Sequence, residues 1–281
     1  MTITYRLLSS ADSISLFECF LHAFSDYQVD MRMSREQFEQ RLARDGVQLE
    51  ISAGAFDGSR MIGFYLNAVG EWLGKQTAYD AGTGVIPDYR RQGIAEELFA
   101  FMVPRLKEAS LTQYLLEVLT ANEAAVSLYR KVGFVDTRSF AVFRRKDPLT
   151  TREDAHVRRV ERPEWELFKS FWGGYPSWQN SIAAVERVIE QTVVVCAYAD
   201  DRCVGYGIAF KPAASLMQLA VAPSYRRRGI GSRILAALQH DVTESLKVNN
   251  IDEALEGAMR FYEANGFKLV LKQYEMIKSL L

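Results

Sequence analysis

The sequence contains the same short motif twice, about half a chain apart. Residues 85–95 read VIPDYRRQGIA and residues 221–231 read VAPSYRRRGIG, and seven of the eleven positions are identical. Gly93 corresponds to Gly229, an offset of 136 residues in a chain of 281. Self-similarity at a fixed spacing is typical of a repeated structural unit, so the motif indicates that the chain folds as two copies of one unit.

Two further pairs of segments repeat in the same order. AFDGSRMIGF (55–64) matches AYADDRCVGY (197–206), and each is an apolar run, a polar turn and a second apolar run, the pattern of a β-hairpin. SLYRKVGF (127–134) matches RFYEANGF (260–267) through a shared Tyr-x-x-x-Gly-Phe. Three matched blocks in one order indicate a tandem duplication.

A polar, charged segment separates the two copies. It reads FRRKDPLTTREDAHVRRV (143–160) and contains Pro148, which predicts an exposed connection. We therefore divide the chain into residues 1–148 and 149–281. Each part is long enough to form its own hydrophobic core.

Composition excludes several classes of protein. Hydrophobic residues make up 48% and charged residues 25% of the chain, and the formal net charge is −1, so we expect packed cores and no nucleic-acid partner. Three cysteines and three histidines predict neither a disulfide framework nor a metal site. The first residues, MTITYRLLSS, do not resemble a signal peptide, and no apolar run approaches the length of a membrane span. We expect a cytoplasmic protein that does not enter a membrane.

Each basic loop lies between a strand-like and a helix-like segment. The apolar runs 77–86 and 215–221 precede the loops, and apolar residues at helical spacing follow them. A helix start has backbone N–H groups without partners, a glycine allows close approach of a ligand, and arginines add positive charge. This combination favours binding of a pyrophosphate. The alternative is a solvated basic turn, which the second copy makes less favoured.

These motifs resemble those of the GCN5-related N-acetyltransferases (GNATs). Arg-x-x-Gly-x-Ala (90–95) and Arg-x-x-Gly-x-Gly (226–231) are similar to the pyrophosphate-binding motif of that family. Asn-x-x-Ala-x-x-x-Tyr (122–129), followed by Gly133 and Phe134, is similar to its second cofactor motif. The resemblance implies an α/β (α+β) fold with two consecutive domains, each a splayed, mixed and mainly antiparallel sheet flanked by helices. It also implies that acetyl-CoA lies in the opening between the fourth and fifth strands.

The resemblance assigns the cofactor contacts to the strand ends and basic loops of both copies. The pantetheine arm is expected along residues 83–86, and the pyrophosphate on the N–H groups of residues 92–95. The candidate cofactor-binding residues are Val85, Ile86, Arg90, Arg91, Gln92, Gly93, Ile94, Ala95, Asn122, Val221, Arg226, Arg227, Arg228, Gly229, Ile230, Gly231 and Tyr262.

Acetyl transfer to a primary amine needs a base and an acid. An amine with a lysine-like pKa near 10.4 is mostly protonated at pH 7, so a base must remove a proton before the nitrogen attacks. An acid helps the CoA thiolate to leave. By the resemblance Tyr129 is the candidate acid, and Glu117 stands where some relatives carry a base; Asp80 is a second candidate carboxylate. The structural alternatives are a half-buried aromatic for Tyr129 and ordinary strand residues for the two carboxylates.

The second copy lacks several of these groups. Lys247 is expected in place of Glu117, Leu216 in place of Asp80, and Leu255 in place of Asn122, whereas Tyr262 matches Tyr129. We therefore predict that the N-terminal copy carries the chemistry. The C-terminal copy is expected to be degenerate or regulatory, either shaping the acceptor site or binding CoA without efficient turnover.

One segment of each copy is expected to cover the acceptor. Residues 19–38 are expected to cover it, with Asp26, Tyr27 and Asp30 as candidate contacts to a cationic amine, and the aromatic segment 171–181 is its counterpart. The predicted function is direct transfer of an acetyl group from acetyl-CoA, in a ternary complex, to a primary amine of a small molecule or peptide. The alternative is an acyl-CoA sensor without turnover. A monomer of two pseudo-symmetric domains and a homodimer both remain open.

Overall fold

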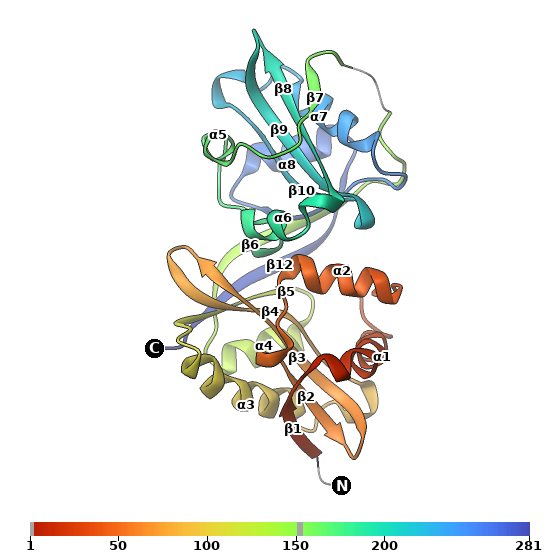
Figure 1. Ribbon diagram of the computed structural model, residues 1–281, viewed down its shortest axis with the longest axis vertical. Helices are drawn as coiled ribbons and strands as arrows, with labels where there is room; N and C mark the ends of the chain where they lie inside the picture. The colour runs from red at the N-terminus through yellow and green to blue at the C-terminus, as the bar shows by residue number, and fades with distance from the viewer. Residues whose placement is uncertain (1–2, 151–153) are drawn as a thin grey trace. The chain divides into compact units, whose positions relative to one another are not determined.

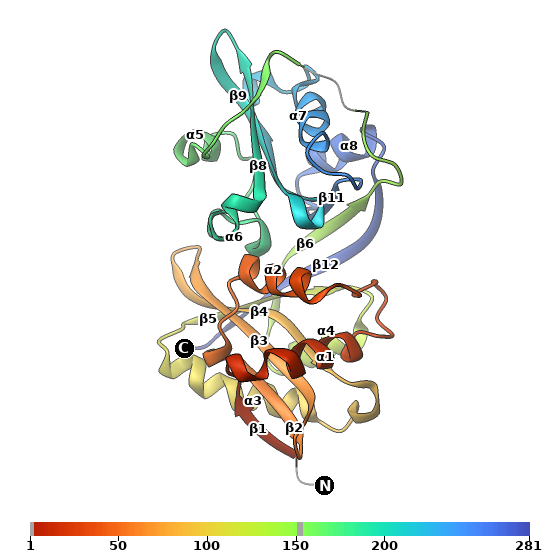
Figure 2. The ribbon, with the colours of Figure 1, turned by 45° about the vertical axis from the view of Figure 1, so that its right-hand side comes forward.

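The computed structural model describes residues 3–150 and 154–281, which form two compact units. Unit 1 consists of Met1–Val118, Asn122–Thr137 and Glu275–Leu281, and unit 2 of Leu119–Ala121 and Arg138–Tyr274. Figures 1 and 2 show the elements of each unit from two directions. Among the described residues, no helix combines the length and apolar character needed to cross a membrane.

Unit 1 contains a mixed sheet with the strand order β1-β2-β3-β4-β5-β12. The pairs from β1 to β4 are antiparallel, and β4 and β5 are parallel. The predicted hairpin at 55–64 is formed by β2 and β3. The strands are β1 (Ile3–Leu7), β2 (Ala53–Asp57), β3 (Arg60–Trp72), β4 (Lys75–Val85), β5 (Gln113–Leu119) and the end of β12 (Lys268–Ser279).

Helices cover both faces of the sheet of unit 1. Successive residues of a strand point to opposite faces, and Phe64 and Tyr65 of β3 mark the two. Phe64 packs against Phe20 of α1 (ring centroids 5.9 Å apart), and Tyr65 packs against Phe99 of α3 (6.2 Å). Helix α2 joins the first face and α4 the second (Figure 1). The helices are α1 (Ser13–Ala23), α2 (Arg35–Asp45), α3 (Ile94–Glu108) and α4 (Glu123–Lys131).

The sheet of unit 1 opens between its fourth and fifth strands. The parallel ladder joins β4 and β5 only from Thr77 opposite Gln113 to Asp80 opposite Leu116, although both strands continue. A register shift against β3 makes Ala81 an extra residue, because Asn67 pairs with Asp80 and Leu66 with Gly82. The open edge of β4 therefore begins immediately after Asp80, as the predicted fold requires.

Unit 2 repeats this plan with the strand order β7-β8-β9-β10-β11-β6. Its fourth and fifth strands, β10 and β11, are parallel and pair at only two positions, Ser215 with Lys247 and Leu216 with Val248. The strands are β6 (Val135–Arg144), β7 (Val157–Arg159), β8 (Thr192–Ala199), β9 (Arg202–Phe210), β10 (Ser215–Val221) and β11 (Lys247–Asp252). The helices are α5 (Trp165–Lys169), α6 (Ile182–Arg187), α7 (Ile230–Gln239) and α8 (Glu256–Ala264).

The compact units differ from the sequence repeats at their ends. Strand β6 begins in unit 1 and belongs to unit 2 from Arg138, whereas β12 begins in unit 2 and belongs to unit 1 from Glu275. Each sheet is thus completed by a strand from the other half of the sequence. The division after residue 148 stays a prediction about the repeats, because similarity between segments does not report which strands pair.

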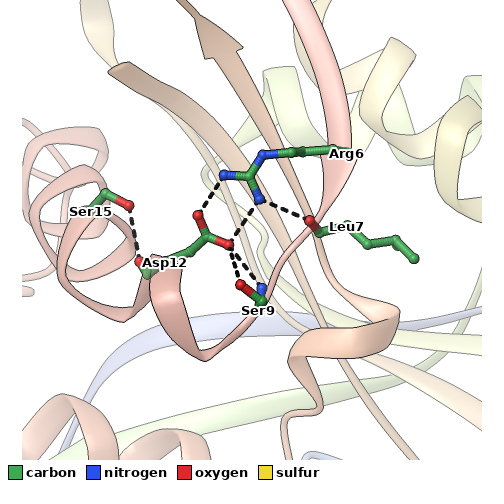
Figure 3. Close-up of polar contacts among 5 residues, drawn as sticks. All are labelled: Arg6, Leu7, Ser9, Asp12 and Ser15. Carbon is green, nitrogen blue, oxygen red and sulfur yellow. Dashed lines mark hydrogen bonds and ion pairs between the residues drawn. The ribbon is translucent and has the colours of Figure 1, made fainter. Parts of the chain in front are cut away.

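A polar cluster fixes the start of α1 to strand β1 (Figure 3). Both carboxylate oxygens of Asp12 accept hydrogen bonds from the Arg6 guanidinium, at 2.6 and 2.9 Å. Asp12 also accepts from the backbone N–H and the hydroxyl of Ser9, at 2.9 and 3.1 Å. The hydrogen bonds from Arg6 hold the pKa of Asp12 at about 2, below its usual 3.8, against the opposing effect of burial.

We expect Asp12→Ala to lower the free energy of unfolding at pH 7 by about 1–2 kcal/mol, because it removes charge-assisted hydrogen bonds to a half-exposed arginine. Because the pKa of Asp12 is lower in the folded state, its contribution is complete above about pH 4 and is lost as the pH falls towards 2. Urea denaturation at pH 7 and pH 3 measures both effects. Asp30→Ala removes an exposed ion pair with Arg32 and should leave stability unchanged; equal losses in the two variants would contradict the prediction.

Candidate active site

The two basic loops have the same backbone conformation. In unit 1 the loop follows a short 3-10 helix (Pro87–Tyr89), and in unit 2 a similar helix (Pro223–Tyr225). Both loops place their second arginine and their glycine at positive φ: 60° and 82° in unit 1, and 64° and 77° in unit 2. A Cβ atom at Gly93 or Gly229 would meet no atom within 4 Å. The glycines are thus required by their conformation and leave the loop surface open.

The first arginine of each loop holds the loop in place. Arg90 donates to the carbonyl of Val85 (3.1 Å) and to that of Ala23 (2.8 Å). Its two terminal nitrogens also bind Asp26, each at 2.7 Å, and this hydrogen bonding lowers the pKa of Asp26. Asp26 is therefore the ion-pair partner of Arg90, and its contact with a cationic amine stays a prediction.

Unit 2 repeats this anchoring. Arg226 donates to the carbonyls of Val221 and Phe171, both at 2.9 Å. The guanidinium groups of Arg90 and Arg226 thus shape the loops. Their contact with a pyrophosphate stays a prediction, because the bonds of Arg226 to the two carbonyls use only its Nε and Nη2. A sequence motif reports that an arginine is present and does not distinguish an anchor from a ligand contact.

The third loop residue is also an anchor, and the second is exposed. Gln92 donates to the carbonyl of Asp88 (3.2 Å), and Arg228 to the carbonyl of Ser224 (3.0 Å). The remaining charged loop residues, Arg91 and Arg227, are exposed. They are the arginines best placed to meet an anion at the loop.

Each loop leads directly into a helix whose first N–H groups point towards it. Gly93 is the N-cap of α3 and Gly229 the N-cap of α7, and neither cap is made by a side chain. The side chains of Ile94 and Ile230 are buried, so these residues offer the ligand only their backbone. The N–H groups at a helix start have no partner within the helix and attract anions. Both loops therefore fit a pyrophosphate.

The other residues predicted to contact the cofactor lie near the openings of the two sheets. Val85 ends β4, and the following Ile86 is buried with its N–H bound to the carbonyl of Ile62 (2.9 Å). Val221 ends β10 in the same way. In unit 2 a Cβ at Gly231 would lie 2.8 Å from the ring of Phe261 on α8, so a larger residue here would have to displace that ring.

Asp80 and Tyr129 form a buried pair at the edge of the opening. The Tyr129 hydroxyl donates to Asp80 Oδ2 (3.1 Å), and Thr83 Oγ1 donates to the same oxygen (2.9 Å). The N–H of Gly82 donates to the other oxygen (2.9 Å). Burial raises the pKa of Asp80 to about 6, although the hydrogen bonds from Thr83 and Tyr129 oppose the shift. Burial and the Asp80 charge raise the pKa of Tyr129.

Glu117 lies at the same level on the opposite face of the sheet. Leu116 pairs with Asp80 in the parallel ladder, so the side chain of the next residue, Glu117, points the other way. Its Oε2 accepts a hydrogen bond from the Tyr79 hydroxyl (3.2 Å). The structure thus brings Asp80 and Tyr129 together and separates both from Glu117.

Asn122 has a structural role, and its contact with the cofactor stays a prediction. It is the N-cap of α4, and its side-chain oxygen accepts from the N–H of Ala125 (3.2 Å). Asn122 also donates to the hydroxyl of Tyr27, whose pKa burial raises. Asp30, the other carboxylate expected near an amine, binds Arg32 at 2.7 and 2.9 Å.

The strand register corrects one comparison between the copies. Leu216 pairs with Val248 as Asp80 pairs with Leu116, so the residue at the position of Glu117 is Asn249. The expectation that Lys247 stands there is wrong, because the similar sequences LEV and LKV do not occupy equivalent positions in the two parallel ladders. Leu255 is the N-cap of α8, as Asn122 is of α4, and it has no side-chain oxygen to cap with. Tyr262 is buried, and burial alone raises its pKa.

Thr83 and Tyr79 are polar partners of the candidate catalytic groups that the sequence did not single out for such roles. Thr83 binds Asp80, and Tyr79 binds Glu117. A usable signal existed for Thr83, since Asp80-Ala81-Gly82-Thr83 is a polar, glycine-containing interruption of an apolar strand. None existed for Tyr79, whose partner is on another strand.

We expect Asp80→Asn to change how stability depends on pH. The pKa of Asp80 is about 6 in the folded protein and about 3.9 in an unfolded chain, so the unfolded state loses the proton first as the pH rises. Asp80 therefore contributes stability below about pH 4 that is lost by about pH 6, a change of about 2–3 kcal/mol. The difference in unfolding free energy between the two proteins, measured by urea denaturation from pH 4 to 8, should change in this window. A constant difference would contradict the prediction.

Family models match both halves of the chain. The model described as "Acetyltransferase (GNAT) family" matches residues 14–134, and that described as "Acetyltransferase (GNAT) domain" matches residues 190–269. The chain is also similar to the [ribosomal protein bS18]-alanine N-acetyltransferase of Escherichia coli K12, with 34% identity over 109 residues, or 36% of this chain and 71% of that protein.

Solved structures share the whole two-unit fold. A tandem GNAT protein from the clavulanic acid biosynthesis pathway covers 100% of this chain and 99% of its own, with a TM-score of 0.74 and 14% identity. A GCN5-related N-acetyltransferase from Sphaerobacter thermophilus covers 99% of this chain and 96% of its own, with a TM-score of 0.74 and 13% identity. At these identities the likeness establishes the fold.

Proposed function

Because the chain belongs to the GNAT family of acetyltransferases, with two tandem copies of the domain, we propose that it transfers an acetyl group from acetyl-CoA to a primary amine of a small molecule or peptide. The transfer is direct, in a ternary complex, and takes place in unit 1 of a cytoplasmic enzyme. The observation that carries the proposal is the Asp80–Tyr129 pair beside the open edge of β4, at the level of Glu117 on the other face.

Unit 1 has two features that can bind the cofactor. One is the start of α3 with its basic loop, called the cradle here, and the other is the unpaired edge of β4. The N–H groups at the start of α3 and the exposed Arg91 face the pyrophosphate, and the edge of β4 beyond Asp80 is free to accept the pantetheine arm as a further strand. Acetyl-CoA, when bound there, supplies the acetyl group as a thioester. The cradle and the edge place that group near Asp80.

The proposed base and the proposed acid lie on opposite faces of the sheet. Glu117 lies on the face covered by α1 and α2, the segment expected to cover the acceptor, and we assign it as the base that deprotonates the amine. Tyr129 lies on the other face and donates the proton to the leaving thiolate. Asp80 binds the Tyr129 hydroxyl and positions it. Unit 2 has leucine at the Asp80 position and asparagine at the Glu117 position, so we assign it a regulatory or substrate-shaping role.

The relative from Escherichia coli is named for a peptide acceptor, the alanine of a ribosomal protein. That name supports including peptide amino termini among the acceptors to be tested. A low-molecular-mass amine fits the same pair of proton-transfer groups, so both classes belong in the first screen.

The test is release of CoA thiol from acetyl-CoA in the presence of single amines and amino-terminal peptides. We expect saturable release with at least one of them, and an acetylated amine as the product by mass spectrometry. Acetyl-CoA binding without release for any acceptor would favour a sensor, and absence of binding would overturn the proposal.

A further inference from the structure

Helix α2 of unit 1 places two charged side chains, those of Arg41 and Asp45, on the face that packs against the rest of the unit. Phe38, Arg41 and Asp45 follow helical spacing, and Phe38 and Asp45 are fully buried. The Arg41 guanidinium lies over the ring of Phe20 on α1 (5.4 Å to the centroid), and 24% of its side chain is exposed. Charges in such a position are costly unless they are compensated.

The buried carboxylate of Asp45 is bound mainly by Arg44, another of the three arginines of α2. Arg44 Nε and Nη2 both lie 2.8 Å from Asp45 Oδ1, whereas Arg41 Nε lies 3.8 Å from Oδ2. Among the described residues, Arg41 makes one hydrogen bond, a long one of 3.4 Å to the carbonyl of Ala81. A guanidinium has five N–H donors, so most of those of Arg41 are available. Burial lowers the pKa of Arg41, although Asp45 opposes the shift.

Arg41 lies at the point where the sheet opens. Ala81 is the first residue of β4 beyond its ladder with β5, and it follows Asp80 directly. The charge of Arg41 also acts on Tyr79, which is the hydrogen-bond partner of Glu117. Arg41 and Glu117 are therefore on the same face of the sheet, one positive and one negative, beside the same opening.

We propose that Arg41 binds a carboxylate of the acceptor, so that the acceptor is an amino acid or a similar small molecule that carries both an amine and a carboxylate. The proposal rests on the function assigned to unit 1 and specifies its substrate class. A guanidinium binds a carboxylate through two parallel hydrogen bonds, which orients as well as attracts it. The amine of the same molecule then lies towards Glu117, and the opposite charges of the zwitterion match those of the site.

The experiment compares matched acceptors, each an L-amino acid and its carboxamide. The amide lacks the negative charge, and its amine is less basic, which by itself favours reaction of the amide. We expect kcat/KM nevertheless to be at least about tenfold higher for the acid. Equal values, or a preference for the amide, would overturn the proposal. Absence of thiol release with every amine and peptide would instead contradict the proposed acetyltransferase function.

Variants of Arg41 test the assignment to this residue. Arg41→Met should lower kcat/KM for the acid by about 10- to 100-fold, mainly through KM, and leave the amide almost unchanged. Arg41→Lys should retain part of the preference for the acid, because lysine keeps the positive charge but cannot form the two parallel hydrogen bonds of a guanidinium. Arg35→Met, on the exposed side of the same helix, should change neither value. Equal losses for acid and amide in Arg41→Met would show a structural role and overturn the assignment.

Discussion

Tyr129→Phe lowers kcat by about 10²–10⁴-fold, the usual contribution of a positioned general acid. The substitution removes only the hydroxyl that donates to Asp80, and the ring keeps its edge contact with Phe134 (centroids 5.6 Å apart). The KM for acetyl-CoA should change little, because the cradle at α3 does not include this residue. Steady-state thiol release with a saturating acceptor measures both constants.

The duplication supplies a matched control for this variant. Tyr262 occupies the equivalent position in unit 2 and is buried to a similar extent, 3% exposed against 8% for Tyr129. Tyr262→Phe therefore removes a similarly buried hydroxyl and should leave kcat within about twofold. A larger loss of kcat in Tyr262→Phe would reverse the roles of the units and remove the assignments of Glu117 and Tyr129.

Gly93→Trp should weaken acetyl-CoA binding by at least about 100-fold, a loss of about 2.7 kcal/mol or more. The Cβ position at Gly93 faces open space at the helix start, so an indole there covers the N–H groups that meet the pyrophosphate. Isothermal calorimetry with acetyl-CoA measures the loss.

Gly229→Trp is the control, because the two glycines share the same strain and the same surroundings. Their φ angles are 82° and 77°, and neither has an atom within 4 Å of a Cβ position, so both variants should lose about 1–2 kcal/mol of stability. Loss of binding only in Gly229→Trp would place the cofactor in unit 2. Unchanged binding in both would contradict the assignment of the loops.

Several features of this protein followed from short stretches of sequence. The hairpins, the strand before each loop and the helix after it were all predicted, and the structure confirms them. These features depend on apolar spacing, turn residues and a glycine at positive φ, which are properties of ten to twenty neighbouring residues. The repeat itself then predicted that each feature occurs twice.

Other features depend on which distant residues meet, and only the tertiary structure decided them. Arg90 carries the family motif, but its side chain binds the carbonyl of Ala23, the last residue of α1, and Asp26 just beyond that helix. The position equivalent to Glu117 proved to be Asn249, because the register of a parallel ladder is set by pairing and not by similar letters. The exchange of β6 and the end of β12 between the units has the same cause.

Arg41 shows this division most clearly. In the sequence it is one of several charged residues of a polar helix, and nothing distinguishes it from Arg35, six residues earlier. The ends of the helix depend on neighbouring residues, since Ser34 is its N-cap and Gly46, in left-handed conformation, follows its last turn. Only the packing of that helix against the opening of the sheet decided which arginine is left with unused donors beside Ala81, because burial and ion pairing are set by contacts across the fold.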